Sequence, residues 1–155
     1  MENCTRINFG HEKWWPFGVT GLFDGGPGWL KILGEAPQLS AKHAWTILDV
    51  YVADAAWTPD AGTFLKTGLG SGDDQAASGY SASGALIYFP TSRAITVDTT
   101  KIAAGSNVRL RWYDPTSGAY TTIASSEAKS TSRSVAFPSS HADGFNDWVL
   151  VVDGI

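Results

Sequence analysis

This 155-residue chain has few cysteines, few charges and no long apolar run. Its one cysteine, Cys4, cannot form an intrachain disulfide, and none of the common zinc-ligand spacings can be built around it. Only 17% of residues are charged, and 11 basic against 15 acidic residues give a net charge of −4 without a basic stripe. Nucleic acid is therefore a poor partner. The absence of polybasic or strongly amphipathic segments, and of any span of membrane length, argues against membrane binding.

Catalytic and targeting motifs are also missing. Residues 1–13 are polar and charged without an apolar stretch, so no signal peptide is expected there. No nucleophile elbow, metalloprotease helix or phosphate-binding loop occurs, and His11, His43 and His141 lack any ligand-type spacing. The sequence therefore predicts no catalytic residue and requires no cofactor.

Aromatic residues and turn formers dominate what is present. Seven Trp, seven Phe and five Tyr occur with 17 Gly and seven Pro, a composition typical of a turn-rich β protein. In the stretch VRLRWY, Val108, Leu110 and Trp112 alternate with more polar residues, which predicts a strand with one buried face. The run WVLVV at 148–152 is apolar on both faces and predicts a central strand.

These patterns predict a mainly β fold, an antiparallel sandwich of jelly-roll or immunoglobulin-like type over residues 75–155. Strands of about five to seven residues, separated by turns at intervals of 8–12 residues, favour a sandwich. The residues expected to be largely buried are Ile87, Phe89, Trp112, Trp148 and Leu150.

The first part of the chain is different. Residues 1–38 place Gly and Pro every few positions, which predicts an irregular segment. One helix is expected from about Ala41 to Ala55, with Ser40 as its N-cap and Trp45 on its apolar face. Residues 58–74, rich in Gly and Asp, are expected to form a linker or an ordered loop.

Candidate binding residues are the aromatic side chains that could face solvent. Sugars stack on flat, exposed rings, and Trp14 with Trp15 is the first candidate because adjacent rings of an extended segment cannot both enter one core. Tyr80, Tyr113 and Tyr120 follow. The alternative is that Trp14 and Trp15 pack against a missing part of a larger protein and leave an apolar patch here.

Carboxylates offer two further hypotheses. Asp73 and Asp74, in the Gly-rich loop GSGDD, could supply oxygen ligands to calcium, although two Asp in such a turn are often simply solvated. Sugar hydrolysis needs two carboxylates about 5–10 Å apart. The residues considered for such a pair are Asp24, Glu35, Asp49 and Asp54. Asp114, which precedes Pro115, is better explained as a turn residue that caps backbone N–H groups.

The stretches LIYFPTSRAITVD, WYDPTSGAY and DWVLVV resemble the C-terminal β-sandwich of bacterial glycosidase-like proteins that carry an apiosidase-like barrel. That sandwich is described as a collagen-binding domain of a collagenase. NFGHEKWWPFG and GWLKILGEAPQLSAKHAWTIL are similar to the last loop and helix of the barrel. The resemblance implies that residues 1–57 are a remnant of a barrel, that 58–74 link it to the sandwich, and that the parent protein is secreted or periplasmic. The family's hydrolytic residues fall on no position of this chain.

The resemblance implies a non-catalytic accessory module of a glycoside hydrolase, with a polysaccharide or glycan as its partner. A small hydrolase and a domain that binds a matrix protein such as collagen remain as alternatives. Too few earlier elements are present for a closed barrel, which favours the module. The many large rings of residues 1–38 also predict self-association into a homo-oligomer.

Overall fold

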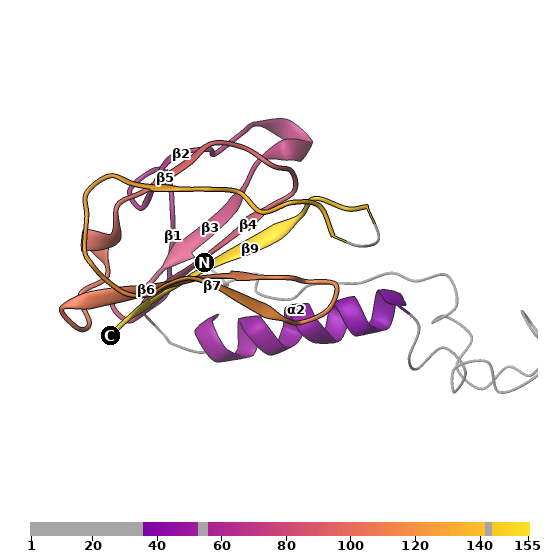
Figure 1. The fold of residues 1–155 in the computed structure, drawn as a ribbon, viewed down its shortest axis with the longest axis horizontal. Coiled ribbons are helices and arrows are strands. Elements are labelled where there is room, and N and C mark those ends of the chain that lie inside the picture. The colour runs from indigo at the N-terminus through magenta and orange to yellow at the C-terminus, as the bar shows by residue number, and fades with distance from the viewer. Residues whose placement is uncertain (1–35, 53–55, 142–143) are drawn as a thin grey trace, which may run out of the picture.

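The computed structural model of the protein describes residues 36–52, 56–141 and 144–155. The described residues form an α-helix and two β-sheets, arranged side by side in Figure 1. The elements in chain order are α2 (Ala36–Val52), β1 (Thr58–Pro59), β2 (Leu65–Thr67), the 3₁₀ turn η1 (Gly72–Asp74), β3 (Ala77–Tyr80), β4 (Gly84–Phe89), β5 (Ile95–Val97), η2 (Thr99–Lys101), β6 (Asn107–Tyr113), β7 (Tyr120–Ala128), β8 (Arg133–Val135) and β9 (Trp148–Gly154).

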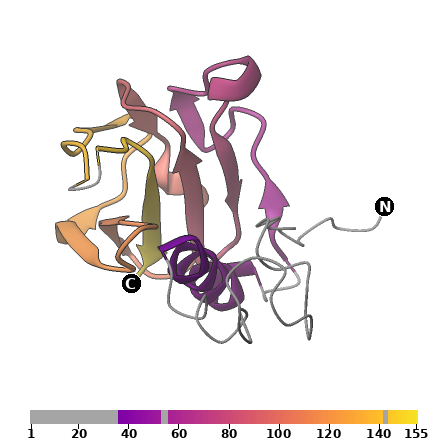
Figure 2. The ribbon, with the colours of Figure 1, turned by 90° about the vertical axis from the view of Figure 1, so that its right-hand side faces the viewer.

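All the described strands pair antiparallel in two sheets, which confirms the predicted sandwich. The larger sheet has the order β1-β3-β4-β9-β6-β7, and the smaller has the order β2-β5-β8. Strand β9 lies between β4 and β6, so the last strand in sequence occupies the middle of the larger sheet (Figures 1 and 2). The two central registers place Leu150 opposite both Ile87 and Trp112.

The main core lies between the two sheets. Successive side chains of a strand point to opposite faces, so every second residue of β4, β6 and β9 enters this core. The five residues predicted to be buried all are, with Trp148 the most exposed of them at 9%. The side chains that join them from the smaller sheet and its connections include Phe64, Leu65, Ile95, Val97 and Val135.

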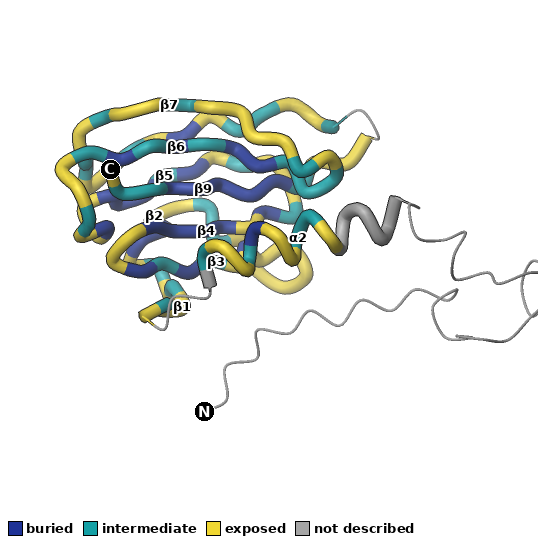
Figure 3. Tube along the Cα trace, turned by 90° about the horizontal axis from the view of Figure 1, so that it is seen from below, coloured by how far each residue is buried: buried dark blue, intermediate teal, exposed yellow. Residues whose placement is uncertain are grey.

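Helix α2 covers the outer face of the larger sheet (Figures 2 and 3). Ile47 is buried against Leu86, Val149 and Val151, which point away from the main core and form a second cluster with Tyr113. The described part is therefore three layers deep, with the helix under the larger sheet and the smaller sheet above it.

Two details of the predicted helix are wrong. It begins at Ala36, so Ser40 lies inside it instead of capping it. Pro37 explains the earlier start, because proline fits the first turn of a helix, where its missing N–H is not needed. Trp45 is 57% exposed, since Ile47 and its neighbours on the opposite side of the helix contact the sheet. The expected end at Ala55 lies outside the described residues.

Residues 58–74 differ from the expected linker. They contain β1 and β2, which pair with β3 and β5 respectively. Phe64 and Leu65 are 0% and 1% exposed and belong to the main core. This segment is therefore an integral part of the sandwich.

The turn between β6 and β7 packs against α2. Asp114 accepts hydrogen bonds from the backbone N–H groups of Thr116 and Ser117 at 2.7 and 3.2 Å, which confirms its interpretation as a turn residue. Gly118 has φ +73°, and a Cβ there would lie 2.8 Å from the His43 ring. Glycine is needed on both grounds, because it alone enters the left-handed region at no cost and allows the helix this close.

Candidate functional site

A polar and aromatic cluster lies on the outer face of the larger sheet, beside α2. It consists of Tyr51 from the helix, Arg109 and Arg111 from β6, Tyr120 from β7 and Asp153 from β9; we call it the outer-face cluster. The strand residues share one face because they follow the two-residue alternation, with Arg109 paired opposite Asp153. The cluster therefore forms where three strands and the helix meet.

Asp153 is the centre of the cluster. Its Oδ1 accepts a hydrogen bond from the Tyr51 hydroxyl at 2.7 Å. Its Oδ2 accepts from the Nε of Arg109 at 3.0 Å and from a terminal nitrogen of Arg111 at 2.9 Å. The same Arg111 nitrogen donates to the Tyr51 oxygen at 2.9 Å. One carboxylate thus holds two guanidinium groups and a phenol in fixed positions.

The ionisation of the tyrosines agrees with this arrangement. Burial, followed by the hydrogen bond and negative charge of Asp153, raises the pKa of Tyr51 well above its usual value. Burial also raises the pKa of Tyr120, although Arg111 opposes it. Both phenols are neutral at physiological pH, so Tyr51 remains a hydrogen-bond donor to Asp153.

Tyr120 is the exposed aromatic ring of the cluster. Its side chain is 43% exposed, and the guanidinium carbon of Arg111 lies 4.2 Å from the centre of its ring, a cation–π contact. Tyr113 packs against it with ring centres 4.9 Å apart. Of the three tyrosines predicted as binding residues, Tyr120 is the most exposed.

The other predicted aromatic residues do not form an exposed platform in the described part of the chain. Tyr113 is 3% exposed, and its hydroxyl donates to the His43 carbonyl under the helix at 2.8 Å. Tyr80 is half-buried and stacks on Phe64 in the main core. For Tyr113 the expectation of a solvent-facing ring is wrong, because the ring lies in the packed layer under the helix, whereas Tyr80 is only partly buried. Trp14 and Trp15 lie outside the described residues.

In the candidate calcium loop, the Asp74 carboxylate is paired with an arginine. Asp73 and Asp74 lie in η1, but the Asp74 carboxylate accepts from Arg93 at 2.6 Å and from the Thr91 hydroxyl at 2.5 Å. The Arg93 guanidinium group therefore supplies the positive charge beside this carboxylate. Within the ranges that the structure describes, no group of three or more His, Cys, Asp or Glu is placed to hold a metal ion.

His141 is a buried histidine between two carboxylates. Its side chain is 2% exposed, with Nδ1 3.2 Å from Asp114 and Nε2 3.7 Å from Asp147. The ring stacks on Trp148 at 4.2 Å, and Nε2 contacts the Asp147 carbonyl. These contacts attach the segment before β9 to the β6–β7 turn. The other described histidine, His43, is half-buried, and its Nδ1 lies 3.0 Å from the Thr116 carbonyl oxygen.

Of the carboxylates considered for a hydrolytic pair, the structure describes only Asp49, which is exposed on α2. Asp24, Glu35 and Asp54 lie outside the described residues.

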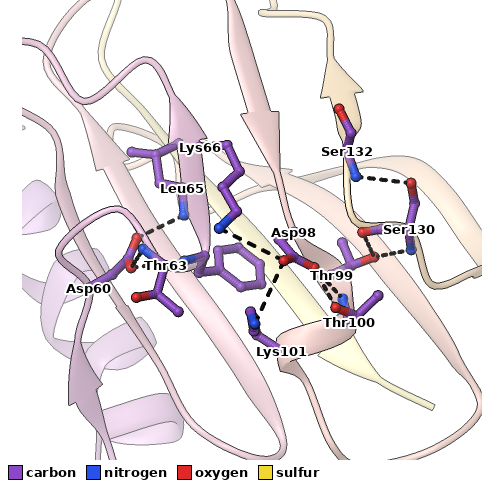
Figure 4. Close-up of polar contacts among 11 residues, drawn as sticks. Asp60, Thr63, Leu65, Lys66, Asp98, Thr99, Thr100, Lys101, Ser130 and Ser132 are labelled. Atoms are coloured by element: carbon purple, nitrogen blue, oxygen red, sulfur yellow. Dashed lines mark hydrogen bonds and ion pairs between the residues drawn. The ribbon is translucent and has the colours of Figure 1, made fainter.

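Figure 4 shows two further aspartates, which organise the smaller sheet. Asp98 is 5% exposed and accepts from the N–H and hydroxyl of Thr100, which caps η2. Lys66 and Lys101 each lie 3.9 Å from its Oδ2. Thr99, the first residue of η2, exchanges hydrogen bonds through its hydroxyl with the backbone of Ser130, between β7 and β8. These contacts are explained by folding.

Asp60 performs a similar task between β1 and β2 (Figure 4). Its carboxylate accepts from the backbone N–H groups of Thr63, Phe64 and Leu65 at 2.7, 2.9 and 2.8 Å. Burial raises the pKa of this carboxyl group, but those three bonds and one from the Ser78 hydroxyl outweigh burial and hold the pKa below its ordinary value. The ionised form is therefore the one that the fold requires.

This lowered pKa predicts a loss of stability in acid. Because the unfolded chain binds a proton more readily than the folded one, the contribution of Asp60 is complete above the unfolded pKa, at about pH 4, and is lost as the pH falls through the folded pKa. Urea unfolding between pH 7 and pH 3 should show this decline, and Asp60→Asn should flatten it. The exposed-site control Asp73→Asn should retain the wild-type slope; equal slopes for wild type and Asp60→Asn would contradict the prediction.

Most contacts of the outer-face cluster cannot be predicted from the sequence. The alternation in VRLRWY placed Arg109 and Arg111 on the polar face of a strand, but it did not identify their partner. Asp153 lies more than 40 residues later, and Tyr51 comes from the helix. Only the register of β9 against β6 brings them together.

The fold and this cluster define a β-sandwich domain with an amphipathic helix packed on its larger sheet. Residues 59–153 match the model of a family described as "Putative collagen-binding domain of a collagenase", and the chain belongs to this family. No curated protein matches the chain. No described helix is both long and apolar enough to cross a bilayer.

Two solved structures share the fold. One is a glycoside hydrolase family 5 structure from Bacteroides vulgatus, with a TM-score of 0.72 and 22% identity over 93% of this chain. The other is a glycoside hydrolase with a TM-score of 0.69 and 22% identity over 92% of this chain. This chain spans 31% of the length of each.

Proposed function

We propose that this chain is the non-catalytic accessory module of a larger glycoside hydrolase-like protein and that it binds glycan. The observation that carries the proposal is the unequal coverage: 93% of this chain aligns with 31% of a glycoside hydrolase. In such a protein, the remaining two thirds supply the space for a catalytic domain. The family match over residues 59–153 supports a binding role for the sandwich itself.

Helix α2 fits a position between the sandwich and that larger part. One side of the helix packs on the sheet through Ile47, while Trp45 and Val50 are 57% and 68% exposed. Residues 1–57 are, on this proposal, the end of the catalytic domain. The exposed side of α2 then faces the rest of that domain.

A glycan-binding role is supported by the outer-face cluster. Carbohydrate sites combine an aromatic surface with a few fixed polar groups that orient the ligand. Tyr120 supplies the exposed ring, and Arg109 and Arg111 supply donors that Asp153 already holds in place. Such an open site is shallow, so dissociation constants on the order of 0.1–1 mM are expected.

The test uses the purified chain with pectic polysaccharide, arabinan and xylan. We expect no release of reducing ends from any of them, together with retardation by at least one in affinity gel electrophoresis. The catalytic alternative predicts turnover that disappears when Asp24, Glu35, Asp49 or Asp54 is changed to its amide. Measurable turnover of that kind would overturn the proposal.

Collagen binding is the second candidate, because the family description names it. Surface plasmon resonance against immobilised triple-helical and heat-denatured collagen would measure it directly. Saturable binding to collagen without retardation by any polysaccharide would replace glycan with a protein ligand.

A further inference from the structure

We propose that the outer-face cluster binds an acidic polysaccharide, with Tyr120 stacking on a sugar ring and Arg109 binding the carboxylate of a uronic acid. This inference rests on the proposed glycan-binding function and names the class of glycan.

The first support is the arrangement of side chains on β6 and β7. Tyr113 pairs with Tyr120 and Arg111 pairs with Thr122, so these residues share the outer face of neighbouring strands. Arg109 follows on the same face of β6, four residues from Tyr113, a separation of about 13 Å along a strand. Aromatic and cationic groups thus form a strip long enough for an oligosaccharide.

The second support is charge. Arg109, Arg111 and Asp153 sum to +1, whereas the whole chain carries −4. Asp153 compensates one guanidinium group, and the second positive charge has no counterpart within the cluster. Among the described residues, Arg109 donates to Asp153 through Nε, and its side chain is 40% exposed, so within this part of the chain its two terminal amino groups are available. Two parallel donors of a guanidinium group match the two oxygens of a carboxylate.

The third support is that the site is held in place without a ligand. Arg111 is 17% exposed, bound to Asp153 and Tyr51, and lies against the Tyr120 ring. Its buried Nε has no hydrogen-bond partner in the described part of the chain. A ring and a guanidinium group that are already fixed lose little conformational freedom when a sugar binds.

The chain contains a matched tyrosine that lacks this setting. Tyr88 lies on the outer face of the same sheet and is 38% exposed, but its hydroxyl points to the carboxylate of Asp147 at 3.4 Å. A negative charge beside the ring disfavours an anionic ligand. Lys101 is the corresponding cation control, since it is 41% exposed and also lies beside an aspartate, in the turn η2 that follows β5.

The experiment compares retardation of the full chain by polygalacturonate, neutral galactan and heparin at low salt and at about 0.5 M salt, where surface charges are strongly screened. We expect polygalacturonate to bind best and the higher salt to weaken it. Tyr120→Ala and Arg109→Ala should each weaken polygalacturonate binding about tenfold, equivalent to about 1.4 kcal/mol. Tyr88→Ala and Lys101→Ala should stay within twofold of wild type.

The other outcomes separate the two proposals. Equal retardation by galactan and polygalacturonate, or no effect of Arg109→Ala, would overturn the acidic preference and leave the glycan-binding module standing. Retardation by none of the polysaccharides would overturn both. Stronger binding to heparin would replace the uronate with a sulfated sugar, and equal losses in Arg109→Ala and Lys101→Ala would mean unspecific charge attraction and overturn the proposed site. Circular dichroism of each variant checks its fold, and Arg109→Gln replaces Arg109→Ala if that variant is unfolded.

Discussion

Replacing Trp112 with alanine is expected to lower the free energy of unfolding by about 3–5 kcal/mol. The ring is 3% exposed and lies at the centre of an aromatic group, with its centre 5.0 Å from Phe137, 6.1 Å from Phe89 and 6.3 Å from Trp148. Its Nε1 also donates to the Ala136 carbonyl at 3.1 Å. The substitution removes these contacts, opens a cavity between the sheets and leaves a carbonyl without its donor.

Urea unfolding followed by tryptophan fluorescence and circular dichroism measures this loss. Trp45→Ala is the control, because that ring is 57% exposed on α2 and its removal should change stability by no more than about 0.5 kcal/mol. Equal effects of the two substitutions would mean that the core is not where the structure places it.

Replacing Asp153 with alanine is expected to cost about 2–3 kcal/mol, somewhat less than for a fully buried ion pair because the side chain is 15% exposed. Two guanidinium groups and the Tyr51 hydroxyl lose their common acceptor. The cost arises mainly from Arg111, which is 17% exposed and is left with an uncompensated charge.

Two controls define this effect. Asp74→Ala removes a carboxylate that is 51% exposed and paired with Arg93, and should cost less than about 1 kcal/mol. Adding Arg111→Met to Asp153→Ala should recover part of the lost stability, since the uncompensated charge of Arg111 is then removed. A double variant as unstable as the sum of the two single variants would contradict this account.

The sequence was sufficient to predict the longer strands and their buried residues. Strands β4, β6 and β9 are six or seven residues long, enough for the alternation in β6 to define a buried face and for the continuous apolar run of β9 to indicate a central strand. The three strands of the smaller sheet have only three residues each, too few for a period to emerge. The sequence therefore predicts a linker or an ordered loop where β2 lies, although Leu65 within β2 and the adjacent Phe64 are core residues.

The candidate site was less predictable, for a physical reason. Exposure of an aromatic side chain depends on what packs over it, and Tyr113 and Tyr120 occupy paired positions on neighbouring strands. Helix α2 covers the first and leaves the second exposed. Composition and alternation treat the two tyrosines alike, so only the position of the helix distinguishes them.

The place of β9 in the larger sheet has a consequence for synthesis of the protein. As the chain emerges from the ribosome, β4 and β6 appear first, and the strand that joins them, Trp148–Gly154, appears last among the described strands. Until then each carries an unpaired edge, and the apolar side chains of β4 have no partner strand on that side. Nascent chains stalled before residue 148 should therefore be especially prone to aggregation and to capture by chaperones.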